Sequence, residues 1–223
     1  MSQNIGIILA GGIGIRFGAD KPKQYLELLG KEMITYSIEC MRNAKSIDDF
    51  IVVLNSDEFV NGRIARTYGV KTIEGGTTRN KSFKNALDYI VNEWPNCEKV
   101  VENNAACPLT KPEWLDEMIL FLDNFDWVQT TLHVTDALGS IHDRMCNRDD
   151  YYLIQSPNAY RLHEILKCFD PDNPNGHPAI QLPPTARGKN IFRDGEVFKV
   201  THPSDIEIAE LMLRRSLQID CLK

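Results

Sequence analysis

The sequence predicts an α/β fold with a mostly parallel sheet, and three observations support this prediction. Apolar runs of strand length alternate with segments of helical periodicity along most of the chain. The first run, Ile5–Ala10, is apolar throughout, as expected of a strand that is covered on both faces. The 223 residues, 43% hydrophobic and 25% charged, have the composition of a globular chain. We therefore expect a single domain over residues 1–223, with helices on both faces of the sheet.

The expected elements follow one another in the order that such a sheet requires. The strands are short apolar or β-branched runs: Ile5–Ala10, Phe50–Leu54, Val70–Ile73, Lys99–Val101, Trp127–Val134 and Val197–Val200. The helices carry apolar residues at helical spacing: Glu32–Met41, Arg79–Val91, Pro112–Leu122, and a last helix that follows a capping box at Ser204–Glu207 and runs to about Leu217. A segment rich in proline, asparagine and glycine, at about 170–188, is expected to form a long loop or projecting arm.

Charge and composition argue against several classes of partner. The net charge is −6, so we expect no DNA or RNA partner, and any phosphate site must be local. No apolar run approaches the roughly 20 residues that span a bilayer, and the first apolar run lacks the basic segment of a signal peptide. The six cysteines are scattered without a CxxC pair, which favours reduced thiols in a cytoplasmic protein.

A glycine-rich loop follows the first expected strand, and it fits neither of two common phosphate motifs. A dinucleotide fingerprint would need glycine at position 17, where the chain has Phe17. The spacing from Gly14 to Gly18 is one residue short of a P-loop. We therefore set both motifs aside.

The residue types of this loop nevertheless suit a triphosphate. Gly11, Gly12 and Gly14 lack Cβ atoms, so backbone N–H groups can approach an anion closely. Arg16 and Lys23 add positive charge beside that backbone. On this chemistry alone, a glycine turn with solvated basic residues explains the pattern equally well.

The run Leu9–Gly18 followed by Pro22–Tyr25 resembles the signature of the sugar-nucleotide pyrophosphorylase-like nucleotidyltransferases. The PKQY run is similar to the cytidylyltransferase branch, which includes methylerythritol-phosphate and ribitol-phosphate cytidylyltransferases. The block from Gly75 to Ser82 resembles the family's second nucleotide block, although a turn before a capped helix explains it too. The resemblance implies a Rossmann-like three-layer αβα nucleotidyltransferase fold and CTP as the nucleotide. It implies these nucleotide contacts: Leu9, Ala10, Gly11, Gly12, Gly14, Gly76, Arg79, Ser82, Asn104 and Ala105.

The chain departs from the family pattern at its expected metal site. Residues 103–108 read Asn-Asn-Ala-Ala-Cys-Pro where the family shows His-Asp-Ala-Ala-Arg-Pro, so Asn104 replaces the metal-binding aspartate and Cys107 replaces the arginine. The resemblance implies Mg²⁺, with Mn²⁺ as the alternative. Carboxylates bind Mg²⁺ better than amides, so the site is expected to be weakened or rebuilt, with Asn104 and with Glu196 or Asp194 as candidate ligands. Cys107 could favour a softer ion, but a packing role is the simpler explanation.

The acceptor is the second point of departure. Arg148 and Lys199 match family positions that hold the acceptor phosphate, although a surface ion pair with Asp149 would also explain Arg148. The stretch from 176 to 188 lacks the acidic motif of the isoprenoid enzymes, and Arg187 in it would suit an acceptor with a carboxylate. This is similar in kind to the phosphoglutamine cytidylyltransferases of capsular phosphoramidate synthesis.

The resemblance therefore implies a cytoplasmic, CTP-dependent enzyme that transfers CMP to a phosphorylated acceptor and releases pyrophosphate. Arg16 and Lys23 would hold the β- and γ-phosphates, and Arg148 and Lys199 the acceptor phosphate. L-Glutamine phosphate is the preferred acceptor, with ribitol 5-phosphate and 2-C-methyl-D-erythritol 4-phosphate as alternatives. A homodimer is expected, and a CTP-binding protein without turnover is the alternative of another class.

Overall fold

The computed structural model describes residues 2–12, 21–141, 146–173 and 176–220, and its centre is a seven-stranded sheet in the order β5-β4-β1-β6-β8-β7-β9. The strands β5, β4, β1 and β6 run parallel, β8 is antiparallel to β6 and β7, and β9 is parallel to β7. The strands of this sheet are β1 (Gln3–Leu9), β4 (Asp49–Leu54), β5 (Lys71–Glu74), β6 (Cys97–Asn104), β7 (Trp127–His133), β8 (Tyr152–Arg161) and β9 (Gly188–Phe192). A separate small ribbon pairs β2 (Glu27–Leu28) with β3 (Lys31–Glu32).

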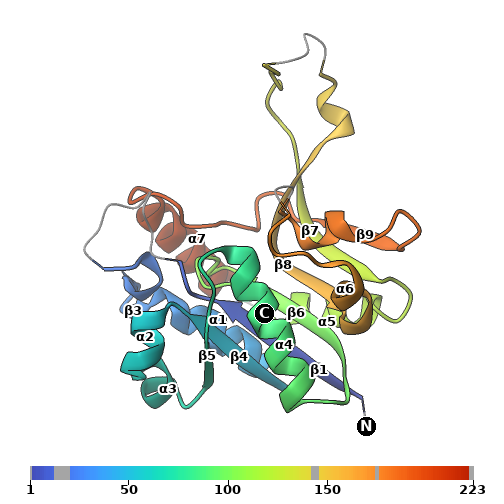
Figure 1. Ribbon diagram of the computed structural model, residues 1–223. Coiled ribbons are helices and arrows are strands. Elements are labelled where there is room, and N and C mark those ends of the chain that lie inside the picture. Colours follow the sequence, from blue (N-terminus) through green and yellow to red (C-terminus); the bar gives the residue numbers. More distant parts are fainter. Residues whose placement is uncertain (1, 13–20, 142–145, 174–175, 221–223) are drawn as a thin grey trace.

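Helices cover both faces of the sheet, which confirms the predicted three-layer arrangement (Figure 1). The α-helices are α1 (Met33–Asn43), α2 (Ser56–Asn61), α3 (Arg63–Tyr68), α4 (Arg79–Glu93), α5 (Pro112–Phe121), α6 (Leu162–Cys168) and α7 (Asp205–Asp220). Short 3₁₀ turns are η1 (Lys23–Tyr25), η2 (Arg148–Asp150) and η3 (Pro178–Gln181). Helices α1 and α5 pack on one face, and α4 and α6 pack on the other.

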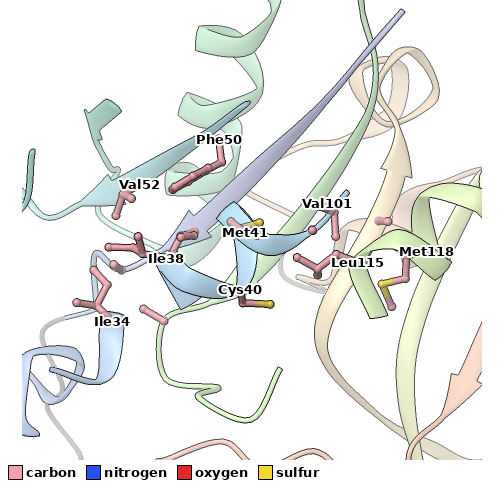
Figure 2. Packing of buried hydrophobic residues seen from close by; sticks show 14 of the residues in the cluster. Ile34, Ile38, Cys40, Met41, Phe50, Val52, Val101, Leu115 and Met118 are labelled. Atoms are coloured by element: carbon pink, nitrogen blue, oxygen red, sulfur yellow. The ribbon is translucent and has the colours of Figure 1, made fainter. Parts of the chain in front are cut away.

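The first face shows how the apolar pattern of the sequence produces this packing. Ile34 and Ile38, one helical turn apart on α1, lie against Val52 of β4, and all three are fully buried (Figure 2). Leu115 and Met118 of α5 close the same cluster on the β6 side. Burying such side chains contributes about 1.5–3 kcal/mol each, so the sheet is a rigid base for the loops at its edges.

The carboxyl ends of β1 and β6 lie at the same edge of the sheet. Leu9 pairs with Asn104 in the register of the two strands, and the N–H of Ala105 donates to the carbonyl of Leu9 at 3.1 Å. The glycine loop after β1 and the Asn-Asn-Ala-Ala run after β6 are therefore neighbours. Ligands of parallel α/β sheets bind at this edge.

Several elements differ from the prediction. Strand β8 was not expected, because Pro157 lies inside it and proline cannot donate to a ladder. The predicted strand Val197–Val200 is wrong, since these residues form no ladder, although the Val200 N–H does donate to the Ala106 carbonyl at 2.9 Å.

The projecting arm lies elsewhere than expected. The described parts of the segment between β7 and β8, residues 134–151, extend away from the sheet (Figure 1). The described residues of the segment at 170–188, namely 170–173 and 176–188, instead belong to the α4 and α6 face, where Ala179 and Leu182 are buried in the core. The expected position of the arm is corrected accordingly, because these two apolar side chains gain more by burial than by exposure.

Candidate functional site

The start of the glycine loop after β1 is held in place by the buried side-chain amide of Gln24. Gln24, 3% exposed, donates through Nε2 to the carbonyls of Ala10 at 2.7 Å and Gly12 at 2.9 Å. With these carbonyl oxygens engaged on Gln24, the loop backbone is fixed at the edge of the sheet. Gly14 and Arg16 lie outside the described residues.

The second glycine block is a tight turn in front of α4. The Ser82 hydroxyl accepts from the Gly76 N–H at 3.1 Å, and Thr78 caps the helix by accepting from the Lys81 N–H at 3.1 Å. A Cβ added at Gly76 would lie 2.3 Å from the Cβ of Lys81, so no other residue fits without a shift. Ser82 therefore holds the turn, and Gly76 brings the backbone close to α4.

A pocket of about 350 Å³ opens at the carboxyl end of β6. Three of the predicted site residues, Arg79, Asn104 and Lys199, line it together. The other lining residues come from α4, β8 and the segment before η3: Asn80, Ile154, Gln155, Ser156, Asn158, Gly176 and His177. The site thus combines segments that are more than 100 residues apart in the sequence.

A lysine links the glycine loop to the segment that carries Lys199. The ammonium of Lys23 donates to the carbonyl of Val200 at 2.7 Å. The Val200 N–H in turn donates to the Ala106 carbonyl, just beyond β6. Lys23 and Lys199 are thereby brought to the same edge of the sheet, and their binding of phosphate stays a prediction.

Arg79 does not stand alone in the pocket wall. It forms an ion pair with Glu102, whose side chain is fully buried on β6. Asn158 of β8 also donates to Glu102, at 3.0 Å, and donates to the carbonyl of Gln155 at 2.8 Å. A buried carboxylate needs such partners, because burying an unpaired charge is very costly.

The residues at the expected metal site do not fit a metal held by protein carboxylates. The Asn104 amide oxygen accepts from the Ala106 N–H at 3.0 Å, and Glu196 lies 3.9 Å from Lys111. Asp194, the other candidate, accepts from His133 at 2.6 Å. In the described part of the chain, no three His, Cys, Asp or Glu residues are grouped as metal ligands.

Two titratable groups near the pocket are held neutral. Burial lowers the pKa of His177 to about 4, so its ring is uncharged at neutral pH. Burial raises the pKa of the Cys107 thiol to about 12, which keeps it protonated and a poor metal ligand. Cys107 therefore packs, as its 2% exposure indicates.

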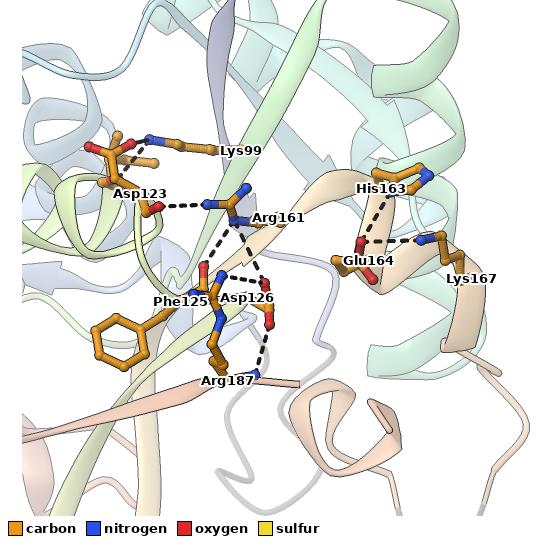
Figure 3. Close-up of polar contacts among 10 residues, drawn as sticks. Lys99, Asp123, Phe125, Asp126, Arg161, His163, Glu164, Lys167 and Arg187 are labelled. Carbon is orange, nitrogen blue, oxygen red and sulfur yellow. Dashed lines mark hydrogen bonds and ion pairs between the residues drawn. The ribbon is translucent and has the colours of Figure 1, made fainter. Parts of the chain in front are cut away.

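Two predicted acceptor contacts lie away from this pocket. Arg148 lies on η2 of the arm, where its guanidinium donates to the Thr135 carbonyl at 2.6 Å and lies 3.8 Å from Asp149. Arg187 lies before β9, where its N–H donates to Asp126 at 2.7 Å (Figure 3).

The position of Arg187 contradicts its expected role. Asp126 precedes β7, and the start of β7 pairs with the end of β8, which in turn pairs with Lys99 at the amino-terminal part of β6. Arg187 therefore lies at the edge of the sheet opposite the pocket. The physical reason is the direction of β9, which runs parallel to β7 and so begins at that opposite edge.

Sequence reasoning missed the residues that β8 and its neighbours supply. Ser156 and Asn158 flank Pro157, where the β7–β8 register shifts, and both line the pocket. Glu102 carried a usable signal, because a charged residue directly after the apolar run Val100–Val101 is unusual for a strand buried on both faces. Gln24 belongs to the PKQY run, but its buried position could not be read from the sequence.

A family model described as IspD: 2-C-methyl-D-erythritol 4-phosphate cytidylyltransferase matches residues 5–215. The chain belongs to the IspD family. It is 27% identical over 219 residues to the 2-C-methyl-D-erythritol 4-phosphate cytidylyltransferase of Thermotoga neapolitana, covering 95% of this chain and 97% of that protein. It is 26% identical to the bifunctional ribulose 5-phosphate reductase/CDP-ribitol pyrophosphorylase Bcs1 of Haemophilus influenzae, covering 96% of this chain but 48% of that protein.

Solved structures of the IspD family share the fold. The 4-diphosphocytidyl-2C-methyl-D-erythritol synthase of Anaerococcus prevotii matches with a TM-score of 0.79 and 22% identity, over 96% of this chain and 99% of that one. The bifunctional IspDF of Campylobacter jejuni matches with a TM-score of 0.78 and 23% identity, over 92% of this chain and 54% of that one. As an IspD-family member, the chain is a CTP-dependent cytidylyltransferase. No helix in its described residues is long and apolar enough to cross a membrane.

Proposed function

We propose that this IspD-family enzyme transfers CMP from CTP to a phosphorylated small-molecule acceptor, with L-glutamine phosphate as the preferred acceptor. The observation that supports the transfer best is the shared pocket of Arg79, Asn104 and Lys199, next to a glycine loop that Gln24 and Lys23 tie to the same edge. The two curated relatives support 2-C-methyl-D-erythritol 4-phosphate and ribitol 5-phosphate as the alternative acceptors.

The proposed chemistry is an in-line displacement at the α-phosphorus. The backbone of residues 9–12 and the turn at Gly76 bind the nucleotide, while Lys23 and Arg16 neutralise its terminal phosphates. Lys199 holds the acceptor phosphate, one oxygen of which forms the new P–O bond as the bond to pyrophosphate breaks. A phosphate oxygen is already ionised at neutral pH, so positioning and charge neutralisation supply the catalysis.

The divalent ion is proposed to arrive with the nucleotide. Asn104 and Glu196 contact other groups, so the described residues offer no carboxylate cage for Mg²⁺ or Mn²⁺. Calorimetric titration with MnCl₂ should show no binding to the free enzyme and clear binding to the enzyme with CTP. Binding to the free enzyme in the micromolar range would overturn this proposal.

The homodimer is likewise a proposal, and it would explain Arg148. Large apolar side chains are exposed on the arm and its base, namely Ile141, Tyr151, Tyr152 and Leu153. A second copy that covers them would place each arm, with Arg148, against the partner's body. If so, mixing the variants Arg148→Ala and Lys199→Ala, each assayed at an acceptor concentration where it is impaired, should raise activity above that of either alone, whereas a monomer in light scattering would contradict the arrangement.

The experiment that tests the function is an assay of pyrophosphate release. CTP, UTP, ATP and GTP would each be combined with L-glutamine phosphate, ribitol 5-phosphate or 2-C-methyl-D-erythritol 4-phosphate. Release with CTP and L-glutamine phosphate is the expected result, and release only with a polyol phosphate would replace the acceptor. CTP binding without release in any combination would favour the non-catalytic alternative.

A further inference from the structure

Polar side chains form one row across four neighbouring strands of the sheet. In strand register, Glu102 of β6 pairs with Asn158 of β8, Asn158 with Gln129 of β7, and Gln129 with Asn190 of β9. Residues paired in register project from the same face of a sheet. We call Glu102, Asn158 and Gln129 the polar row, since these three are at most 1% exposed.

The polar row is out of place on this face. Two residues nearer the opposite edge of the sheet, the residues paired in register on these strands are Val100, Tyr160 and Trp127. Their side chains belong to the apolar core. Three adjacent polar residues in the continuation of that core weaken packing unless their hydrogen bonds are satisfied. The row therefore calls for a physical explanation.

Each member of the polar row has a buried oxygen without a hydrogen-bond donor. Oε2 of Glu102, Oδ1 of Asn158 and Oε1 of Gln129 have no partner within the described chain. The amide nitrogens are engaged, because Asn158 donates to Glu102 and Gln155, and Gln129 lies 3.2 Å from Nδ1 of His177. All three unmatched groups are thus acceptors, and what would satisfy them is a molecule rich in N–H or O–H donors.

The polar row meets the pocket at three points. Asn158 itself lines the pocket, and so do Arg79, which pairs with Glu102, and His177, which contacts Gln129. One wall of the pocket is therefore formed by Arg79, Asn158 and His177, and Glu102 and Gln129 lie in contact with these residues.

The charge of Glu102 indicates which kind of hydrogen-bond donor on a bound molecule the polar row favours. A carboxylate with one unpaired oxygen in a buried site attracts an ammonium group by charge as well as by a hydrogen bond, whereas the hydroxyl of a polyol offers the hydrogen bond alone. Arg79 has five N–H groups, and those not used on Glu102 can pair with a carboxylate or carbonyl. Glu102 and Arg79 together therefore suit a bound molecule that carries an amine beside a carboxylate.

The position of the polar row assigns it to the acceptor rather than to the nucleotide. The glycine segments at 9–12 and 75–76 lie over β1, β4 and β5, whereas the row begins at β6 and extends away through β8 and β7. Lys199, the proposed acceptor-phosphate contact, lines the same pocket as Asn158.

We propose that the polar row, with His177 and with Arg79, which the family resemblance had placed among the nucleotide contacts, selects the acceptor: it admits a phosphorylated compound with an amine beside a carboxylate in preference to a phosphorylated polyol. This inference rests on the proposed cytidylyl transfer. It assigns the selectivity to Glu102, at a strand position where the sheet would otherwise carry an apolar residue.

The test compares two acceptors and two matched variants. Steady-state rates with CTP would be measured for L-glutamine phosphate and for ribitol 5-phosphate. The wild type should favour the amine-bearing acceptor in kcat/KM by about tenfold or more, because a site built for N–H donors discriminates against ligands without them. Glu102→Gln should raise the KM for that acceptor about tenfold and leave the KM for CTP within twofold.

The control is Glu98→Gln, the same change at an exposed position of the same strand, which should alter neither constant. Equal or better use of ribitol 5-phosphate by the wild type would overturn the inference, as would an equal effect of Glu102→Gln on both acceptors. Should Glu102→Gln fail to fold, Gln129→Met keeps the side-chain volume, removes one acceptor oxygen and should shift selectivity in the same direction.

A binding measurement separates failure of this inference from failure of the proposed function. If no acceptor supports pyrophosphate release, calorimetry with L-glutamine phosphate on the CTP complex still tests the row. If L-glutamine phosphate binds and Glu102→Gln weakens that binding tenfold, the role of the polar row would be supported and the proposed transfer reaction rejected. Absence of binding to the wild type would overturn both.

Discussion

The two sides of the site are built from different parts of the chain. On the glycine side, comprising residues 9–12 and 75–76, the backbone forms the structure, held by Gln24 and Ser82, and glycine at position 76 lets it run close to α4. On the pocket side, comprising Asn104, 154–158, His177 and Lys199, side chains form the wall. The glycine side suits a nucleotide common to a whole family, whereas side chains on the pocket side can change with the acceptor.

Lys23→Ala should have the largest effect, because Lys23 joins the two sides. We expect kcat to fall about 100- to 1,000-fold, the usual result of removing a fixed donor from a developing charge. Lys21→Ala is the matched control, since Lys21 lies at the surface beside Glu32 at 3.2 Å, and it should stay within twofold. Similar small losses in both variants would remove Lys23 from the catalytic group.

Lys199→Ala should affect the pocket side alone. We expect the acceptor KM to rise about 10- to 100-fold, as for loss of a charged contact to phosphate, while the KM for CTP stays nearly constant. Lys167→Ala, in an exposed ion pair with Glu164 (Figure 3), is the control and should change neither constant. A larger change in the KM for CTP would mean that the two sides are not separate.

Gly76→Ala should affect the glycine side alone. The added Cβ would lie 2.3 Å from the Cβ of Lys81, so the turn must shift away from α4. We expect the KM for CTP to rise about tenfold and the acceptor KM to stay constant, since positioning depends on small displacements. Gly139→Ala, where a Cβ meets no atom within 4 Å, should leave CTP binding unchanged.

His177 offers the smallest and most specific effect, on stability rather than on rate. Its folded-state pKa of about 4 lies below the ordinary value of 6.5, so the unfolded chain binds more protons between these values. Unfolding free energy should therefore be lost as pH falls from about 6.5 to 4, by about 3 kcal/mol at most. Denaturant titrations of His177→Gln should lack this loss, whereas those of the exposed His163→Gln should retain it.

The difference between the glycine side and the pocket side also explains how much of each could be predicted from the sequence. Glycines in a sequence mark positions where the backbone turns or passes close to other atoms. The loop at Gly11–Gly12 and the turn at Gly76 could therefore be located before the fold was known. Asn158 and Gln129 become neighbours only when β8 pairs with β6 and β7. Strand β8 was not predicted, because Pro157 lies within it. Arg187 was placed incorrectly because a residue's edge of the sheet depends on strand direction, which local pattern does not record.

The hydrogen bond between Lys23 and the Val200 carbonyl has a consequence for the order of events. The segment bearing Lys199 is tethered at Val200 by two bonds, one to Lys23 and one to Ala106. A triphosphate that draws the Lys23 ammonium to itself loosens the first tether and leaves the second. We expect this release to adjust the position of Lys199 in the pocket, so initial-rate kinetics should follow a compulsory sequence, with CTP as the leading substrate and the acceptor second.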